Sequence, residues 1–595
     1  MVSGLVDCGN MDSPAGRAEG ARPRDSNVAT LALSFRFPRP EPVLRSWLPL
    51  VALLPCTVPL AAQDSVPPAD TTHLEAPRDS AGQGPFHSIV ETDSLGRPII
   101  KYVEIRTSDI FDSTEAKGFL PHLMNALHFT TRYRIVQREL LFEVGEPYDS
   151  AKAAEVARNL RRLAIFRKVR VDSATTDSGF VLKVLAQDGW STQLDFRFRS
   201  AGKQTDWQAS LSELNLLGTA TRFVTRYRHT PDRSLWNFQF QQPRLVWRTV
   251  SLGLRYESRS DGKRGSINLD RPFFSLSDRA GISTLLDIRN ERVLQFREGF
   301  SSPSDSLRRQ FAFGRVEAAK ALSAGSKGYL RLGVVAQVRR DDYSAWPLQP
   351  TAQSVTGAVG PFMEWRRANY IVTRGFAKQG RDEDVDVSNF LRVGLFAAPG
   401  FLGYDTAGIG AAAQVRIGTK FPRGFAWIDS RVNGLYNSAG LDSGSVTLGG
   451  TATVSPAHRH LLIGHADVGW IKNPLPATEF DLGFAIGPRG FPIHAFTGDR
   501  TYFTMAEYRY TAAEDLFKVL DLGLAGFVDH GGAWYHNEAR RVGTNVGLGL
   551  RLSASRAADA NTSRLDLAYR FKNDREKAGW VFVIGSGLVF STQPR

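Results

Sequence analysis

The feature that most restricts the fold of this chain is an alternation of apolar and polar residues that runs from Trp190 to the C-terminus. In residues 565–571, leucine and aromatic side chains alternate with Asp, Ala and Arg, and residues 520–529 and 546–552 follow the same rule. Because successive side chains of a β-strand point to opposite faces, a period of two predicts strands with one apolar and one polar face. We find no convincing amphipathic helix in this region, so it is predicted to consist of β-strands.

Two architectures satisfy this alternation, and the alternation alone does not separate them. In a soluble sandwich the apolar face points inward, whereas in a membrane barrel it meets lipid and the polar face lines the lumen. Three features favour the barrel: an export signal precedes the region, aromatic residues mark strand ends, and no linker divides a region too long for one sandwich. At about 25 residues for each strand with its connection, residues 190–595 predict a transmembrane antiparallel β-barrel of about 16 strands.

The composition excludes two other classes of protein. With 42% hydrophobic and 23% charged residues, the chain is too polar for a bundle of membrane helices, each of which needs about 20 consecutive apolar residues. It is also too apolar and too aromatic for a disordered chain. The formal net charge of +14 is not gathered in a dense Lys/Arg run, so we expect a basic lumen and contacts with anionic lipid head groups, and no nucleic-acid partner.

Residues 1–62 are predicted to be a leader that ends in a secretory signal peptide. The stretch Ser46–Ala62 carries no charge, follows three arginines between residues 36 and 45, and closes on two alanines, which is the order of a signal peptide. The alternative is a buried hydrophobic segment. Cleavage near the alanines would remove both cysteines, Cys8 and Cys56, and leave a mature chain without disulfides.

Between the leader and the strand-rich region we predict a linker and one small domain. Residues 63–97 are rich in Asp, Ser, Pro, Thr and Gly, a composition typical of a flexible linker. Residues 98–188 have the order strand, helix, helix, strand, strand, which indicates an α+β unit. Asp149 or Ser150 is expected to cap the second helix. The expected elements are a strand over Ile99–Ile105, helices over residues 130–142 and Ala151–Ala164, and strands over Phe166–Val171 and Phe180–Ala186.

Four segments carry motifs that point to one family. Residues 145–171 read GEPYDSAKAAEVARNLRRLAIFRKVRV, Asn215–Thr219 read NLLGT, Pro488–Phe491 read PRGF, and residues 527–531 read FVDHG. Together they resemble the BamA/TamA outer-membrane assembly superfamily, which also includes two-partner secretion transporters. The resemblance covers nearly all of residues 98–590, and it implies that the α+β unit at 98–188 is a POTRA-type domain.

The resemblance also implies a loop that folds back into the barrel. Arg489, Gly490 and Phe491 match the arginine-glycine-aromatic motif of the family's long sixth extracellular loop. Gly490 is expected to let the backbone turn tightly. Phe491 is expected to wedge against the barrel wall.

A matching strand motif is implied to receive this loop. Phe527, Asp529 and Gly531 form the F-x-D-x-G pattern, and by analogy Arg489 pairs with Asp529. The alternation agrees on one point, because Asp529 has the same parity as Asp521 and therefore belongs to the lumen face. A lumenal carboxylate paired with arginine costs less free energy than one that faces lipid.

The C-terminal strand resembles the signal by which barrel proteins are recognised for insertion. Gly585, Leu588 and Phe590 carry this resemblance, and five residues follow Phe590.

No constellation of residues indicates catalysis, a metal or a cofactor. His458, His460 and His465 lie close together, but no carboxylate or cysteine completes a ligand set, so a strand-turn cluster is favoured over a metal site. The sequence contains neither a nucleophile elbow nor a Walker motif. We therefore expect a protein that is not an enzyme.

The expected function is assistance in the insertion or translocation of proteins at the outer membrane, with the N-terminal domain in the periplasm. The implied partners are unfolded outer-membrane or secreted client proteins, outer-membrane lipid, and periplasmic or inner-membrane accessory proteins. The alternatives are a secretion pore dedicated to one partner and a passive outer-membrane channel.

Overall fold

The computed structural model describes residues 90–588, apart from 112–114, 178, 202–203, 246–249, 301, 346–348, 405, 475–477, 484–485 and 559–561. The predicted leader, most of the predicted linker, and Phe590 lie outside the described residues. The described part comprises a large β-barrel and a small α+β unit that precedes it in the chain.

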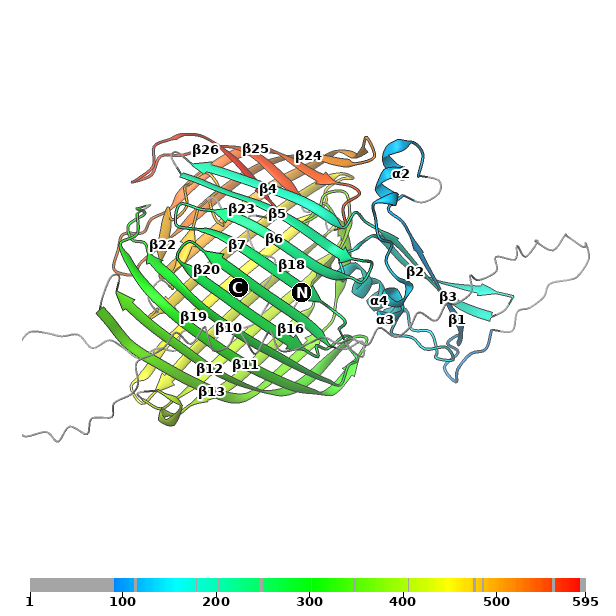
Figure 1. The fold of residues 1–595 in the computed structure, drawn as a ribbon, viewed down its shortest axis with the longest axis horizontal. Coiled ribbons are helices and arrows are strands. Elements are labelled where there is room, and N and C mark those ends of the chain that lie inside the picture. The colour runs from blue at the N-terminus through cyan, green and yellow to red at the C-terminus, as the bar shows by residue number, and fades with distance from the viewer. Residues whose placement is uncertain are drawn as a thin grey trace, which may run out of the picture. The chain divides into compact units, whose positions relative to one another are not determined.

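The barrel is antiparallel, and its strands lie side by side in sequence order until the last pairs with the first. Figure 1 shows them running obliquely around the barrel. The described residues form a barrel of 20 strands, so the prediction of about 16 is wrong. The strands are β4 (Thr192–Ala201), β5 (Gln204–Leu216), β6 (Thr221–His229), β7 (Ser234–Gln242), β8 (Ser251–Arg259), β9 (Gly262–Asp270), β10 (Ala280–Gln295), β11 (Asp305–Gly325), β12 (Gly328–Ala345), β13 (Gln349–Arg367), β16 (Asn389–Ala398), β17 (Gly408–Phe421), β18 (Gly424–Asn437), β19 (Gly440–Val454), β20 (His460–Lys472), β23 (Arg500–Leu516), β24 (Leu520–Trp534), β25 (Gly543–Ala554), β26 (Ser563–Arg570) and β27 (Gly579–Ser586).

The predicted strand number is too low because many connections are tight turns. Gly325 pairs with Gly328 across a two-residue turn, and Phe421 pairs in the same way with Gly424. Two-residue hairpins of this kind use almost no chain between strands. Each strand with its connection therefore takes about 20 residues rather than 25.

The two faces of the barrel differ in the way that the alternation predicts. On β25, Leu548 is 72% exposed whereas Arg551 is 0% exposed. On β24, Leu524 is exposed whereas Asp521 and Asp529 are buried. An apolar outer face around a polar interior belongs against hydrocarbon, which excludes the soluble sandwich. The fold is a transmembrane barrel of the kind found in outer membranes.

The α+β unit consists of a three-stranded sheet, on which α3 and α4 pack, and a further helix, α2. Its elements are β1 (Ile100–Ser108), α2 (Phe119–Ala126), α3 (Tyr133–Arg138), α4 (Ser150–Arg162), β2 (Phe166–Thr176) and β3 (Gly179–Asp188). The sheet has the order β1-β3-β2, with β1 parallel and β2 antiparallel to β3. Val156 and Leu160 of α4 pack into one core with Leu182 and Val184 of β3. None of the helices in the described residues is long and apolar enough to cross a membrane.

The helices of this unit differ in part from those expected. The side chain of Asp149 accepts hydrogen bonds from the backbone N–H groups of Ala151 and Lys152, so α4 begins at Ser150. The helix expected over residues 130–142 is confined to α3, because the backbone N–H and hydroxyl of Thr131 bond to Asp188 and hold the preceding chain extended. Helix α2 has no counterpart in the prediction.

Two connections of the barrel fold to its inside. One joins β13 to β16 and carries the short strands β14 (Tyr370–Arg374) and β15 (Asp382–Asp386). The other joins β20 to β23 and carries β21 (Phe480–Leu482) and β22 (Phe496–Gly498). Phe376 of the first connection and Phe491 of the second belong to one apolar cluster inside the barrel. A 3-10 helix, η1 (Gly400–Leu402), follows β16.

The lipid-facing surface gives a first prediction. Leu548→Arg places a charge on the outer face in the middle of β25 and should destabilise the folded barrel by about 2–4 kcal/mol. Ile409→Arg, an equally apolar outward position at the end of β17, is the control and should cost less than about 1 kcal/mol. Urea titration of the barrel in lipid vesicles measures both, and equal losses would contradict this placement of the bilayer.

Candidate functional site

The connection between β20 and β23, residues 473–499, folds into the barrel in its described part, and we call it the lumenal loop. It contains the Pro-Arg-Gly-Phe motif at residues 488–491. Arg489 and Phe491 are both 0% exposed and are among the largest fully buried side chains of the described residues. A surface turn would leave them in solvent, so this segment is enclosed by the barrel wall.

Arg489 binds Asp529 of β24 through both ends of its guanidinium. Its Nε donates to Oδ2 at 2.8 Å and its Nη2 donates to Oδ1 at 3.0 Å. The backbone N–H of Arg489 also donates to Asp529, at 3.2 Å. The planar fork of arginine matches a carboxylate in this bidentate way, which sets both distance and orientation. The structure thus brings together the two residues that the family resemblance pairs.

Further charged residues on neighbouring strands complete a cluster around Arg489. Its Nη1 donates to Glu507 of β23 at 3.0 Å and to Asp566 of β26 at 3.3 Å. Arg551 of β25 bridges the same two carboxylates, at 2.9 Å and 2.6 Å. We call the following seven residues the charge cluster: Arg489, Glu507, Arg509, Asp529, Arg551, Arg564 and Asp566.

Four guanidinium groups thus meet three carboxylates where almost no water reaches. Glu507 and Asp566 are 1% and 0% exposed. The ring of Phe527 lies 3.7 Å from the guanidinium carbon of Arg489 and covers its face. Interactions between charges are strong in such a site, but leaving any one of them without its partners is costly. The cluster therefore fixes the lumenal loop to β23, β24, β25 and β26 together.

Gly490 stands where the lumenal loop approaches β25 closely. It does not have a positive φ, whereas a Cβ placed on it would lie 3.0 Å from the Cβ of Asn545 on β25. Its N–H donates to Oδ1 of Asn545 at 3.1 Å, and Nδ2 of Asn545 donates to Asp529 at 2.9 Å. Phe491 packs on Phe496 with ring centroids 5.1 Å apart.

The other residues singled out by motif lie as follows. Gly531 stands on β24, where the carbonyl of Tyr502 closes the space that a side chain would need. Gly585 stands on β27 beside the guanidinium of Arg564. Leu588 is partly buried against the apolar cluster that contains Phe491. Phe590 lies outside the described residues.

Sequence reasoning missed several members of the site. Asp566 and Arg551 occupy positions on the polar face of their strands, so the alternation marks them as lumenal without indicating what they bind. Asn545 has the same parity, and nothing near it in the sequence signals its contact with Gly490. A search for charged residues on the polar faces of consecutive strands would have found Asp566 and Arg551.

The lumenal loop is also held at the rim of the barrel, beyond the strands. His494 contacts Asp481 through Nδ1 at 2.6 Å and Asp232, in the turn between β6 and β7, through Nε2 at 2.9 Å. Its ring stacks on Phe296 with centroids 3.6 Å apart. Burial alone would lower the pKa of His494, but the hydrogen bonds to the two aspartates outweigh it and raise the pKa to about 9.

The barrel closes through a weak seam. Among the described residues, β27 pairs with β4 at one position, Val583 opposite Arg199. On its other side β27 pairs with β26 from Ser563–Ser586 to Arg570–Gly579 without interruption. The seam lies between the two segments that the sequence places there, the strand near residues 194–198 and the C-terminal strand.

Two of the three histidines considered as metal ligands have other partners. His465 bonds to Thr451 and Asp467, and His460 bonds to Tyr508. In the described part of the chain no group of three or more His, Cys, Asp or Glu residues is placed to hold a metal ion.

A closed barrel with an apolar outer band and a loop anchored in its lumen defines the class as an outer-membrane β-barrel. No family model matches the chain, and no curated protein matches it. Among solved structures, the chain is similar to BamA from Haemophilus ducreyi lacking POTRA domains 1-3, with 11% identity over 82% of this chain and 84% of that one and a TM-score of 0.37. It is similar to CdiB from Escherichia coli, with 10% identity over 82% and 76% and a TM-score of 0.42. It is also similar to CdiB from Acinetobacter baumannii, with 11% identity over 83% and 74% and a TM-score of 0.40.

Asp529→Ala should lower the heat resistance of the folded barrel. The substitution leaves the buried guanidinium of Arg489 without its main partner, and breaking a buried pair costs about 3–5 kcal/mol. The temperature at which the fast-migrating folded band disappears on gels measures the effect. Arg340→Ala, which removes a half-exposed pair with Asp342, is the control and should leave that temperature unchanged. An unchanged melting profile for Asp529→Ala would count against the pairing.

The rim contact predicts a pH dependence. A histidine whose pKa is raised in the folded state contributes stability that is fully present below its unfolded pKa of about 6.5 and is lost as the pH rises through the folded value. The barrel should therefore become less heat-resistant between pH 7 and pH 10, as the proton of His494 is lost above about 9. His494→Gln should flatten this interval, and an identical pH profile in the two proteins would refute the assignment.

Proposed function

We propose that this protein assists the insertion or translocation of client proteins at the outer membrane. The observation that carries the proposal is the contrast between the seam, where the described residues pair at one position, and the charge cluster that holds the neighbouring strands. Asp566 and Arg564 of the cluster stand on β26, one strand away from the seam. The charge cluster therefore joins the strands of the wall as far as β26, whereas the described pairing that closes the barrel is short.

A weak seam gives client strands a place to pair inside the membrane. A bare strand edge in hydrocarbon leaves backbone N–H and C=O groups without partners, at several kcal/mol for each group. If β27 and β4 separate, client strands can form main-chain hydrogen bonds with the two exposed edges. The proposed role therefore needs no catalytic group and no cofactor, and the protein is not an enzyme in this proposal.

We propose that the α+β unit acts as a POTRA-type domain in the periplasm. Strands β1 and β2 are the two edges of its sheet, and an extended client segment can add to an edge through main-chain hydrogen bonds. The proposed partners are unfolded outer-membrane or secreted client proteins, outer-membrane lipid, and accessory proteins of the periplasm or inner membrane.

Depletion of the protein followed by outer-membrane proteomics tests this role. Loss of many barrel proteins is expected for a general assembly factor. Loss of a single secreted protein would indicate a dedicated secretion pore instead, and an unchanged membrane proteome would refute any role in assembly or secretion.

A seam lock makes the test specific to the mechanism. The sequence contains only Cys8 and Cys56, so a disulfide between Cys at positions 199 and 583 would stand alone in the barrel. The oxidised Arg199→Cys/Val583→Cys protein should fail to restore the depleted proteins, and reduction should recover them. The control is Ala568→Cys/Val581→Cys, which bridges the fully paired β26 and β27 and should restore the proteome whether oxidised or reduced.

A further inference from the structure

The connection between β13 and β16, residues 368–388, differs from its neighbours at the same end of the barrel. The adjacent connections β11–β12 and β17–β18 are the two-residue turns 326–327 and 422–423. Arg367 at the end of β13 pairs directly with Asn389 at the start of β16, so a two-residue turn would suffice here as well. The chain instead forms a hairpin of β14 and β15, which we call the strap.

The tip of the strap reaches strands far from its base. Gln379 donates through its backbone N–H to the hydroxyl of Thr562, just before β26, at 2.9 Å. Its side-chain amide donates to the hydroxyl of Thr511 on β23, at 2.8 Å. Strands β17 to β20 separate β16 from β23 around the barrel. A hairpin that starts between β13 and β16 and ends on β23 and β26 therefore crosses the bore.

The tip is pressed closely against the far wall. Gly380 has a φ of 69°, and a Cβ on it would lie 2.3 Å from the carboxylate of Asp521 on β24. Only glycine combines this backbone conformation with this approach. Arg381 is 8% exposed and donates to the carbonyl oxygen of Ala558 at 2.8 Å.

An apolar seat joins the strap to the wall and to the lumenal loop. Phe376, which is 2% exposed, packs edge-on against Phe425 and Trp427 of β18, with ring centroids 5.3 Å and 5.9 Å away. The same apolar cluster contains Phe491 and Phe496 of the lumenal loop. The two inward-folded connections thus form one continuous packed body across the lumen.

Helix α4 of the α+β unit holds the base of the strap. Arg161 donates to Asp384 through Nε at 2.6 Å and through Nη2 at 2.7 Å. The guanidinium carbon of Arg158 lies 4.3 Å from the centre of the Tyr370 ring. The bidentate pair is less than a quarter exposed on either side, so it resists screening better than a surface pair.

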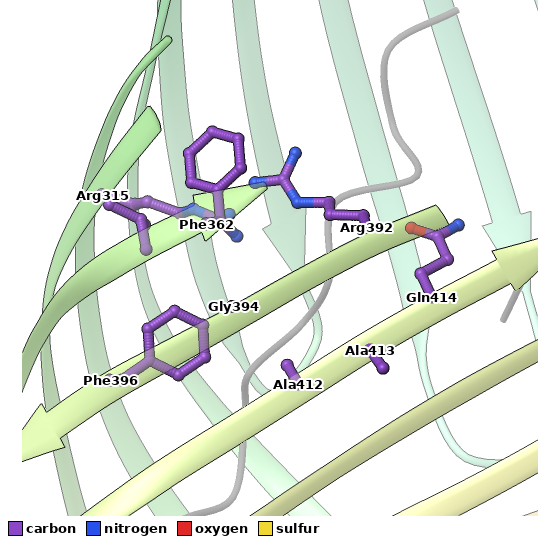
Figure 2. Close-up of a pocket in the computed structure, with 9 residues that line it drawn as sticks. Arg315, Phe362, Arg392, Gly394, Phe396, Ala412, Ala413 and Gln414 are labelled. Atoms are coloured by element: carbon purple, nitrogen blue, oxygen red, sulfur yellow. The ribbon is translucent and has the colours of Figure 1, made fainter. Parts of the chain in front are cut away.

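A cavity of about 690 Å³ remains on the side of the strap that faces α4. It is lined by α4, the strap and the inner wall from β10 to β18. Figure 2 shows a small pocket next to it on that wall, where Arg315 and Arg392 stand beside Phe362 and Phe396. Both of these arginines bond to Glu317, at 2.7 Å and 2.8 Å. The strap is therefore the partition between this cavity and the part of the lumen that the loop fills.

The geometry points to the strap as a gate that closes the bore and is latched by α4. Displacement of α4 breaks the pair between Arg161 and Asp384 and frees the strap at its base. The tip is also connected to the charge cluster, because Arg509 donates hydrogen bonds to the carbonyl oxygens of Gly375 and Phe376. The same guanidinium binds Glu507 at 2.7 Å. This gate goes beyond the proposed assembly role, which a permanently open or permanently filled barrel would also allow.

Conductance of the full chain in planar lipid bilayers tests the gate. Wild type should conduct little and only in brief openings. A variant in which residues 368–388 are replaced by Asn-Gly should show a steady conductance several-fold larger, because the partition is gone. A strapless variant that runs as a folded band on gels and conducts like wild type overturns the proposal. A wide and steady pore in wild type overturns it as well.

A second variant decides the question if the strapless chain does not fold. Phe376→Asp keeps the chain length and removes only the apolar seat of the tip, and it should raise the open fraction several-fold. An open fraction equal to that of wild type overturns the proposal.

The latch is tested separately by a charge exchange. Arg161→Glu and Asp384→Arg should each increase the frequency of openings several-fold, and the double variant should return it toward wild type. Arg374→Ala is the matched control, since it removes an exposed pair with Asp382 within the strap and should not change gating. If the single variants gate like wild type, or if the double variant is no closer to wild type than the singles, α4 is not the latch. The proteome of depleted cells tests the assembly role independently of these measurements.

Discussion

The guanidinium of Arg489 lies in the barrel with none of its surface exposed, and most of the interior is arranged around that constraint. A cation without water must be met by carboxylates at hydrogen-bond distance. Here they come from three strands, as Glu507 of β23, Asp529 of β24 and Asp566 of β26. A shift of one residue in any of these strands would turn its carboxylate outward to lipid. The position of the loop and the register of the wall therefore determine each other.

In residues 520–529, 546–552 and 565–571 the alternation shows which side chains share a face, and this is why the lumen face was predictable there. Asp529 and Asp521 share a face in the alternation, and both are buried inside the barrel. The alternation shows to which face of the sheet a side chain points, but it does not show which strands are neighbours. The contacts of Arg551 with Glu507 and Asp566 depend on the pairing of neighbouring strands, and that pairing follows from turn lengths and closure.

The predicted number of strands is too low, and neither the strap nor α2 was predicted. The prediction of about 16 strands assumed about 25 residues for each strand with its connection, and tight turns such as the one between Phe421 and Gly424 make that length too large. Residues 370–374 read YIVTR, which is ordinary strand composition, whereas residues 382–386 read DEDVD, in which residues that favour strands are scarce. The sequence therefore does not mark the strap as a hairpin. Its direction is decided by distant partners such as Thr511 and Trp427, to which no local pattern refers.

The choice of charges rather than apolar packing beside the seam has a physical consequence. Apolar side chains of similar volume often stabilise an interior as well as buried ion pairs do, but they tolerate small shifts in position. A bidentate arginine does not, since a displaced carboxylate loses both hydrogen bonds and remains buried without a partner. Strands β23 to β26 are therefore held in one arrangement, whereas the described residues of β27 and β4 pair at one position. In the proposed role, the strands that carry the charge cluster would keep this arrangement when β27 and β4 separate.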